Sequence, residues 1–101
     1  MKIDAPINRY DGWVVIPSEI VDVAPHVADF ATFVVHRQTQ DIRFHPLGWA
    51  ISNLETGYSV SGVDAKTRSE CLHKARAFLS NISRAKMKRA LAKAARDSRL
   101  R

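Results

Sequence analysis

Short apolar runs rich in β-branched and aromatic residues recur through the first half of the chain. Residues 13–16 read Trp-Val-Val-Ile, which predicts a strand, and Pro17 predicts its end. A serine and a glutamate then favour a short helical turn over residues 18–23. Residues 30–36 predict the next strand, and residues 42–44 predict a further short one.

The clearest β pattern lies between Trp49 and Val60. Trp49 and Ile51 alternate with small or polar residues, and so do Tyr58 and Val60. A polar segment separates the two pairs and ends at Gly57, which can adopt the positive φ that a tight turn needs. The pattern predicts a β-hairpin.

After Gly62 the apolar period changes from two residues to three or four. Thr67 and Glu70 have the spacing of a capping box, in which each side chain accepts a hydrogen bond from an exposed N–H at a helix start. The apolar residues that follow recur at helical spacing: Leu72, Ala75, Phe78, Leu79 and Ile82. Strands followed by a helix predict an α+β fold, with a small antiparallel sheet packed against a long, basic C-terminal helix.

The same helical face becomes basic further along the chain. On one continuous helix, the apolar stripe of residues 72–82 continues as Lys86, Arg89, Lys93 and Arg96. We favour this interpretation, in which the second half of a continuous or slightly kinked helix projects beyond the domain. In the alternative interpretation, the helix breaks within residues 80–83. A second helix then turns a separate apolar stripe toward the core: Met87, Ala90, Leu91 and Ala94.

One apolar cluster between sheet and helix is expected to form the core. Its expected members are Trp13, Phe33, Val35, Trp49, Ile51, Val60, Leu72, Leu79 and Ile82. The two tryptophans are assigned to it because large aromatic side chains dominate the cores of small domains. Cys71 is expected at the edge of the helical stripe, where it would pack as a small apolar residue.

Length and composition fit one globular domain over residues 1–101, since 46% of the residues are hydrophobic and 26% are charged. No apolar run reaches the roughly 20 residues that a membrane span needs, so no membrane partner is expected. The N-terminus lacks the pattern of a secretion signal. Together with a single cysteine, this favours a cytoplasmic location.

Charge is distributed unevenly along the chain. Residues 1–65 contain four Lys or Arg and eight Asp or Glu, a net charge of −4. Residues 66–101 contain twelve Lys or Arg and two Asp or Glu, a net charge of +10. An acidic, mainly β body is therefore followed by a basic helical segment. This distribution is typical of a domain that binds a polyanion through one secondary-structure element.

The basic segment contains the candidate binding residues: Arg84, Lys86, Lys88, Arg89, Lys93, Arg96 and Arg99. Lys and Arg release the condensed counterions of a nucleic acid, and Arg can donate two hydrogen bonds to one phosphate. Nucleic acid or a nucleoprotein complex is therefore the expected partner. A second hypothesis is a protein–protein inhibitor that docks the same residues on an acidic or nucleic-acid-binding surface. In the simplest alternative, these charges only keep the helix soluble.

Recognisable catalytic and metal-binding motifs are missing from the sequence. It has no Gly-rich phosphate loop, no Gly-x-Ser-x-Gly elbow and no His-Glu-x-x-His motif. The potential metal ligands lack the paired spacing of a zinc site: His26, His36, His45, Cys71 and His73. We therefore expect no enzyme activity, no cofactor and no metal. A small enzyme without a recognisable motif is the third hypothesis.

Residues 48–60, followed by the capped helix start at residues 67–70, resemble short proteins of bacteriophages and mobile elements. In those proteins a "Trp-x-Ile…Thr-Gly" hairpin precedes a capped helix, and the matching residues here are Trp49, Ile51, Thr56 and Gly57. The resemblance covers about residues 48–79. It implies a bacterial or phage origin and an accessory role, including inhibition of host defence complexes in the manner of anti-CRISPR proteins. It assigns no site residue.

Overall fold

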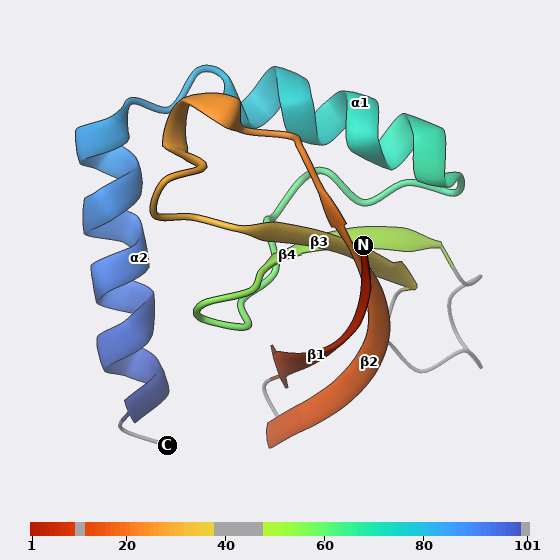
Figure 1. The fold of residues 1–101 in the computed structure, drawn as a ribbon, viewed down its shortest axis with the longest axis horizontal. Coiled ribbons are helices and arrows are strands. Elements are labelled where there is room, and N and C mark those ends of the chain that lie inside the picture. The colour runs from red at the N-terminus through yellow and green to blue at the C-terminus, as the bar shows by residue number, and fades with distance from the viewer. Residues whose placement is uncertain (10–11, 38–47, 100–101) are drawn as a thin grey trace.

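The strands of the sheet follow one another in space as they do along the chain. The computed structural model describes residues 1–9, 12–37 and 48–99, and within them the sheet has four strands in the order β1-β2-β3-β4. All three neighbouring pairs are antiparallel. The bounds are Lys2–Arg9 for β1, Gly12–Val21 for β2, Phe33–Arg37 for β3 and Trp49–Asn53 for β4. Figure 1 shows β1 and β2 curving together away from the other two strands.

Two α-helices follow the sheet, and a short 3₁₀ helix lies before β3. The 3₁₀ helix η1 spans Pro25–Val27, α1 spans Arg68–Leu79 and α2 spans Arg84–Arg99. Helix α1 packs against β4, whereas α2 contacts η1. Figure 1 shows that α2 turns sharply away from α1 and runs down one side of the molecule. The α+β class with an antiparallel sheet is confirmed, but the single long helix is wrong because the chain turns at residues 80–83.

Strand β2 is longer than its sequence indicates. It continues past Pro17 to Val21, so both the strand end at Pro17 and the helical turn over residues 18–23 are wrong. Pro17 lies opposite Asp4 of β1, but β2 pairs with β3 only from Glu19 onward. A proline is tolerated where one edge of a strand is unpaired, because its missing N–H then breaks no ladder hydrogen bond on that side.

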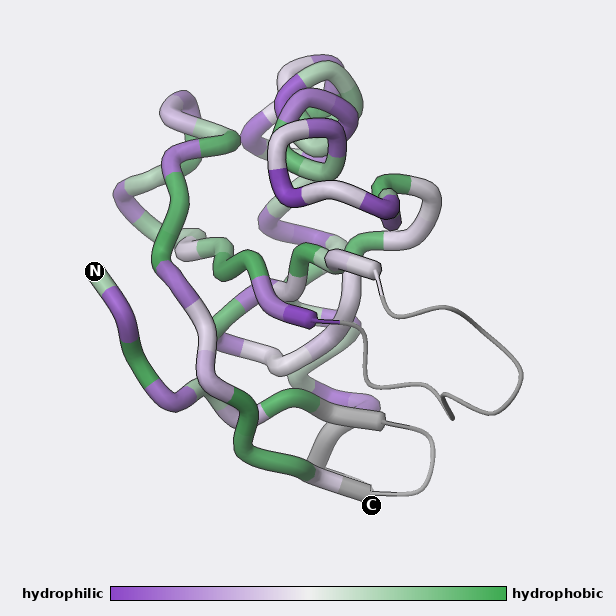
Figure 2. Tube along the Cα trace, turned by 90° about the vertical axis from the view of Figure 1, so that its right-hand side faces the viewer, coloured by the Kyte–Doolittle hydropathy of each residue, from purple (hydrophilic) through white to green (hydrophobic). Residues whose placement is uncertain are grey.

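The first strand was missed by the sequence analysis. In β1, Ile3, Ala5 and Ile7 alternate with polar residues and Pro6, and the alternation is visible from the N-terminus in Figure 2. Ala5 and Ile7 are fully buried. A half-buried edge strand explains this period of two, since one of its faces packs on the core while the other faces solvent.

The predicted hairpin after β4 is present but short, with a single bridge between its two arms. Ser52 and Ser59 form a bridge there, with hydrogen bonds from the Asn53 N–H to the Tyr58 carbonyl oxygen and from the Val60 N–H to the Ile51 carbonyl oxygen. Gly57 adopts a φ of +75°, as predicted. The predicted strand at residues 30–36 begins at Phe33, and the one at residues 42–44 lies outside the described residues.

The core consists of two clusters instead of one. The larger cluster joins β3 and β4 to both helices, and most of the expected residues belong to it: Phe33, Val35, Ile51, Leu72 and Leu79 are buried, while Trp49, Val60 and Ile82 are half-buried against them. The smaller cluster centres on Ala5, Ile7 and Val34. Trp13 belongs to neither cluster and is 50% exposed, so its assignment to the core is wrong. Phe78, expected on the buried stripe, is also exposed.

Candidate nucleic-acid interface

The turn between the helices is built by polar side chains that satisfy backbone groups at both helix ends. At the end of α1, the Ser80 hydroxyl and the Asn81 amide both donate to the Ala77 carbonyl oxygen, at 3.1 and 3.0 Å. At the start of α2, the Ser83 Oγ accepts a hydrogen bond from the Lys86 N–H at 3.2 Å. Ser83 therefore caps a new helix, as Ser, Thr, Asp and Asn commonly do.

Arg84 fixes the first turn of α2 to the loop that precedes β3. Its guanidinium donates to both carboxylate oxygens of Asp29, at 2.7 and 2.9 Å, and to the His26 carbonyl oxygen at 2.7 Å. It also lies 5.1 Å above the Phe30 ring, and the Lys88 ammonium lies 5.2 Å from the same ring. The hydrogen bond from Arg84 holds the pKa of the Asp29 carboxyl at about 2, below its usual value of 3.8. Arg84 therefore acts first as an anchor for α2.

The inner face of α2 packs on the larger core cluster. Met87 is 4% exposed, and Leu91 is half-buried against the same cluster. Ala94 is half-buried as well, whereas Ala90 is exposed. The favoured projecting helix is therefore wrong, and the alternative, a break with a second helix turned toward the core, is confirmed except at Ala90.

The outer face of α2 consists of cations. We call Lys86, Arg89, Lys93 and Arg96 the basic face of α2; all four are exposed. None of their side chains forms an ion pair or hydrogen bond within the part of the chain that the structure describes. At 1.5 Å per residue, the face extends over about 15 Å. The exposed residues that flank it are three alanines, Ala85, Ala90 and Ala92, and one carboxylate, Asp97, which lies one turn after Lys93. The basic face is therefore exposed to solvent, and Asp97 is the one carboxylate beside it among the described residues of α2.

The predicted binding residues thus divide into three groups. The basic face contains four of them, while Arg84 and Lys88 are directed to Asp29 and Phe30. Arg99 is the last residue of α2, beyond the turn that ends the basic face. The division follows from helix phase, because positions 86, 89, 93 and 96 lie opposite Met87 and Leu91.

A serine–histidine pair that the sequence analysis did not identify lies inside the sheet. The His36 Nε2 and the Ser52 Oγ are 2.7 Å apart, and the His36 Nδ1 is 2.7 Å from the Arg37 carbonyl oxygen. Because a carbonyl oxygen can only accept, Nδ1 donates and Nε2 accepts from the serine hydroxyl. Burial lowers the pKa of His36, which favours the neutral ring.

Burial also decides what this pair can do. Ser52 is 0% exposed and His36 is 2% exposed, so a substrate carbonyl cannot reach the hydroxyl. A nucleophile must touch the atom that it attacks. We therefore interpret the pair as a satisfied polar contact between β3 and β4.

The potential metal ligands are scattered. His26 is hydrogen-bonded to the Ile82 carbonyl oxygen at 2.7 Å, Cys71 is buried, and His73 is exposed on α1. His45 lies outside the described residues. Within residues 1–9, 12–37 and 48–99, no group of three His, Cys, Asp or Glu side chains is placed to hold a metal ion.

The helices of the described chain lack the combination of length and apolar character required to cross a bilayer. Comparison of the chain with protein-family models, with curated protein sequences and with solved structures finds no match.

Proposed function

We propose that this protein is a non-catalytic nucleic-acid-binding protein that contacts the phosphate backbone through the basic face of α2. The observation behind the proposal is that four exposed cations align on one helical face without an intramolecular carboxylate partner among the described residues. Surfaces that serve only solubility usually intersperse charges of both signs. We also propose a cytoplasmic location, where nucleic-acid partners are available.

The physical driving force would be the release of counterions from the nucleic acid. Each phosphate neutralised on a duplex changes the slope of log K against log salt concentration by about −0.9. Four contacts would therefore contribute a slope of roughly −3.6. Contacts to phosphate carry no base information, so binding through this face alone would be insensitive to sequence.

The anchor at Arg84 supports the proposal because it fixes the helix before binding. The Arg84–Asp29 pair and the buried Met87 hold α2 against the body of the protein. The cations are therefore displayed on a helix that is already docked, and binding does not have to order a free tail. This favours a docked interface over a disordered basic tail.

Neutralising the basic face tests the proposal. The test variant replaces Lys86, Arg89, Lys93 and Arg96 with Gln. A control with the same charge change replaces four exposed cations elsewhere with Gln: Lys2, Lys66, Lys74 and Arg76. Fluorescence anisotropy with labelled duplex and single-stranded DNA and RNA, at several salt concentrations, gives affinity and slope. We expect the test variant to bind more weakly, and the slope of its log K against log salt concentration to fall in magnitude by up to about 3.6. The control should lose much less affinity and slope.

Equal affinities and slopes for wild type and test variant would contradict the proposal, as would an equal loss in the control. Because exposed charges contribute little to stability, both variants should keep the wild-type melting temperature to within a few degrees.

A protein–protein inhibitor, in the manner of an anti-CRISPR protein, is the second candidate function. The observation that favours it is an apolar surface on β2 that nucleic acid does not need: Trp13 and Val15 are 50% and 66% exposed, and alternation places them on one strand face with Pro17. A pull-down from a bacterial lysate separates the two candidates. Capture of one protein in stoichiometric amount that survives nuclease treatment would favour the inhibitor, and loss of all partners after nuclease would favour nucleic-acid binding.

A further inference from the structure

A cleft opens where β2 and β3 separate. The two strands pair only from Glu19, opposite Val35, to Val21, opposite Phe33. Beyond Glu19, β2 remains paired with β1, while β3 beyond Val35 remains paired with β4. The two pairs of strands therefore diverge, and the open cleft between them has a volume of about 550 Å³. A cleft of this size falls within the usual range for small-molecule sites.

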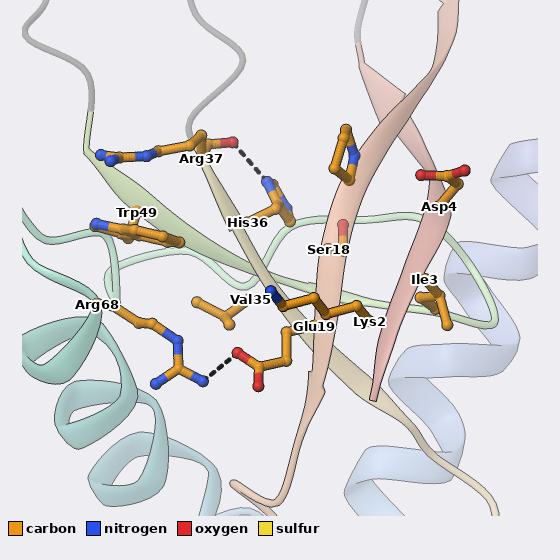
Figure 3. A pocket seen from close by; sticks show the side chains of 11 residues that line it. Lys2, Ile3, Asp4, Ser18, Glu19, Val35, His36, Arg37, Trp49 and Arg68 are labelled. Carbon is orange, nitrogen blue, oxygen red and sulfur yellow. Dashed lines mark hydrogen bonds and ion pairs between the residues drawn. The ribbon is translucent and has the colours of Figure 1, made fainter.

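The floor and walls of the cleft combine apolar surface with charged groups. Ile3, Pro17, Val35 and Trp49 supply the apolar surface. The charged groups come from four elements: Lys2 and Asp4 from β1, Glu19 from β2, Arg37 from β3 and Arg68 from α1. Figure 3 shows the Lys2 side chain pointing into the cleft, and Arg37 and Trp49 along one wall.

Two of the charged groups neutralise each other. Arg68 donates a hydrogen bond to the Glu19 carboxylate and forms an ion pair with it across the cleft floor. This pair joins the start of α1 to β2. It leaves two cations, Lys2 and Arg37, against one carboxylate, Asp4, so the remaining side chains of the cleft have a net positive charge.

Arg37 is held in place by an aromatic ring. Its guanidinium carbon lies 4.3 Å from the centroid of the Trp49 ring, which is a cation–π contact. Neither Lys2 nor Arg37 forms an ion pair with any residue that the structure describes. Both cations are therefore available to a ligand.

His36 lines the cleft but adds neither charge nor a free donor. Its two ring nitrogens are engaged by the Arg37 carbonyl oxygen and the Ser52 hydroxyl, and burial lowers the pKa of the ring. The polarity of the cleft is thus set by Lys2, Arg37 and Asp4.

We propose that this cleft binds a small organic anion with a flat apolar body, such as an aromatic carboxylate or phosphate ester. Lys2 and Arg37 contact the anionic group, since both donate to carboxylate and phosphate oxygens. Pro17 and the exposed part of Trp49 contact the apolar body. Asp4 opposes the anion and limits its affinity.

The cleft is separate from the basic face of α2. In Figure 1 the end of β3 and the start of α1 lie at one side of the molecule, and α2 lies at the other. A ligand in the cleft and a nucleic acid on α2 would therefore occupy different surfaces, and the two proposals fail or hold independently.

A nitrogen–proton correlation NMR titration tests the proposal through the indole signals of the two tryptophans, which a Trp13→Phe variant assigns. The probes are benzoate and phenyl phosphate, with benzamide as a neutral analogue of the same shape. We expect the Trp49 signal to shift and saturate with at least one anion, at a lower concentration than with benzamide, and the Trp13 signal to stay in place. The two anions report whether a carboxylate or a phosphate is preferred.

Three single variants and one control complete the test. Lys2→Ala and Arg37→Ala should each weaken binding of the anion by about two- to fivefold, and Asp4→Asn should strengthen it by a similar factor. Lys66→Ala removes an exposed cation outside the cleft and should leave the affinity unchanged. Absence of a saturating Trp49 shift, equal affinity for benzamide, or indifference to the Lys2, Arg37 and Asp4 variants would each overturn the proposal.

Discussion

Gly57 shows how one residue couples two distant parts of the sheet. It has a φ of +75°, and a Cβ atom there would lie 2.4 Å from the Trp13 ring and 2.9 Å from the Pro6 carbonyl oxygen. The turn after β4 therefore packs directly against the hairpin of β1 and β2. Trp13 covers this glycine with part of its ring, which explains why only half of this large aromatic side chain is exposed.

Gly57→Ala should destabilise the protein more than Gly62→Ala does. Both glycines have positive φ, at +75° and +84°, but nothing lies within 4 Å of a Cβ at Gly62. Gly62→Ala therefore measures the loss of stability caused by a positive φ alone, about 1–2 kcal/mol. Gly57→Ala should lose roughly 1–3 kcal/mol more, because its Cβ also conflicts with the Trp13 ring. Urea unfolding measures both. Trp13→Ala should recover part of the added loss, and equal losses in the two glycine variants would refute the contact.

Local sequence patterns predicted several helices and strands, whereas contacts between distant residues determine the bounds of the others. The capped start of α1 is readable because Thr67 and Glu70 lie three residues apart, and the Thr67 hydroxyl accepts from the Glu70 N–H at 3.2 Å. The extension of β2 beyond Pro17 depends on pairing with β1 up to Glu19 and with β3 from Glu19 to Val21, and no local pattern reveals this pairing. The break between the helices likewise depends on the docking of Met87 against the core, which a helical period alone does not specify.

The candidate interface was more predictable than the fold around it. The cations at positions 86, 89, 93 and 96 share one face of any helix that contains them, whether it projects or docks. The role of Arg84 could not be predicted, because its partner Asp29 is 55 residues away in the sequence. The cleft could not be predicted from the sequence for the same reason, since its charged groups come from separate elements.

Thr67→Ala should lower the free energy of unfolding by about 0.5–2 kcal/mol, since the first turn of α1 would lose its side-chain cap. Ser69→Ala is the matched control, because Ser69 is exposed in the same turn and is not the capping residue. The control should change stability by less than about 0.5 kcal/mol. Chemical denaturation of the two variants measures the difference. Similar values for both would show that the hydrogen bond from Glu70 N–H to Thr67 contributes nothing measurable.

At the scale of the molecule, the proposed binding surfaces are attached to the body in different ways. The cleft is framed by paired strands and by the ion pair between Glu19 and Arg68. The basic face lies on α2, which is attached through the turn at residues 80–83, the Arg84–Asp29 pair and its inner apolar residues. Elements with few buried contacts open at lower free energy than the rest of a protein. Helix α2 is therefore expected to open before the sheet does.

Truncation of single core residues tests whether α2 opens before the sheet. Met87 is the most deeply buried residue of α2, so Met87→Ala should lower the free energy of local opening of α2 by about 2–4 kcal/mol while the sheet retains most of its protection. Leu79 belongs to α1 and is 2% exposed within the shared cluster, so Leu79→Ala should lower protection throughout the chain by about 2–5 kcal/mol. Hydrogen exchange measured by mass spectrometry on both variants separates the two patterns. If Met87→Ala instead lowered protection in β3, β4 and α1 as much as in α2, the helix would unfold only with the whole domain. The basic face would then be as rigid as the sheet that supports it.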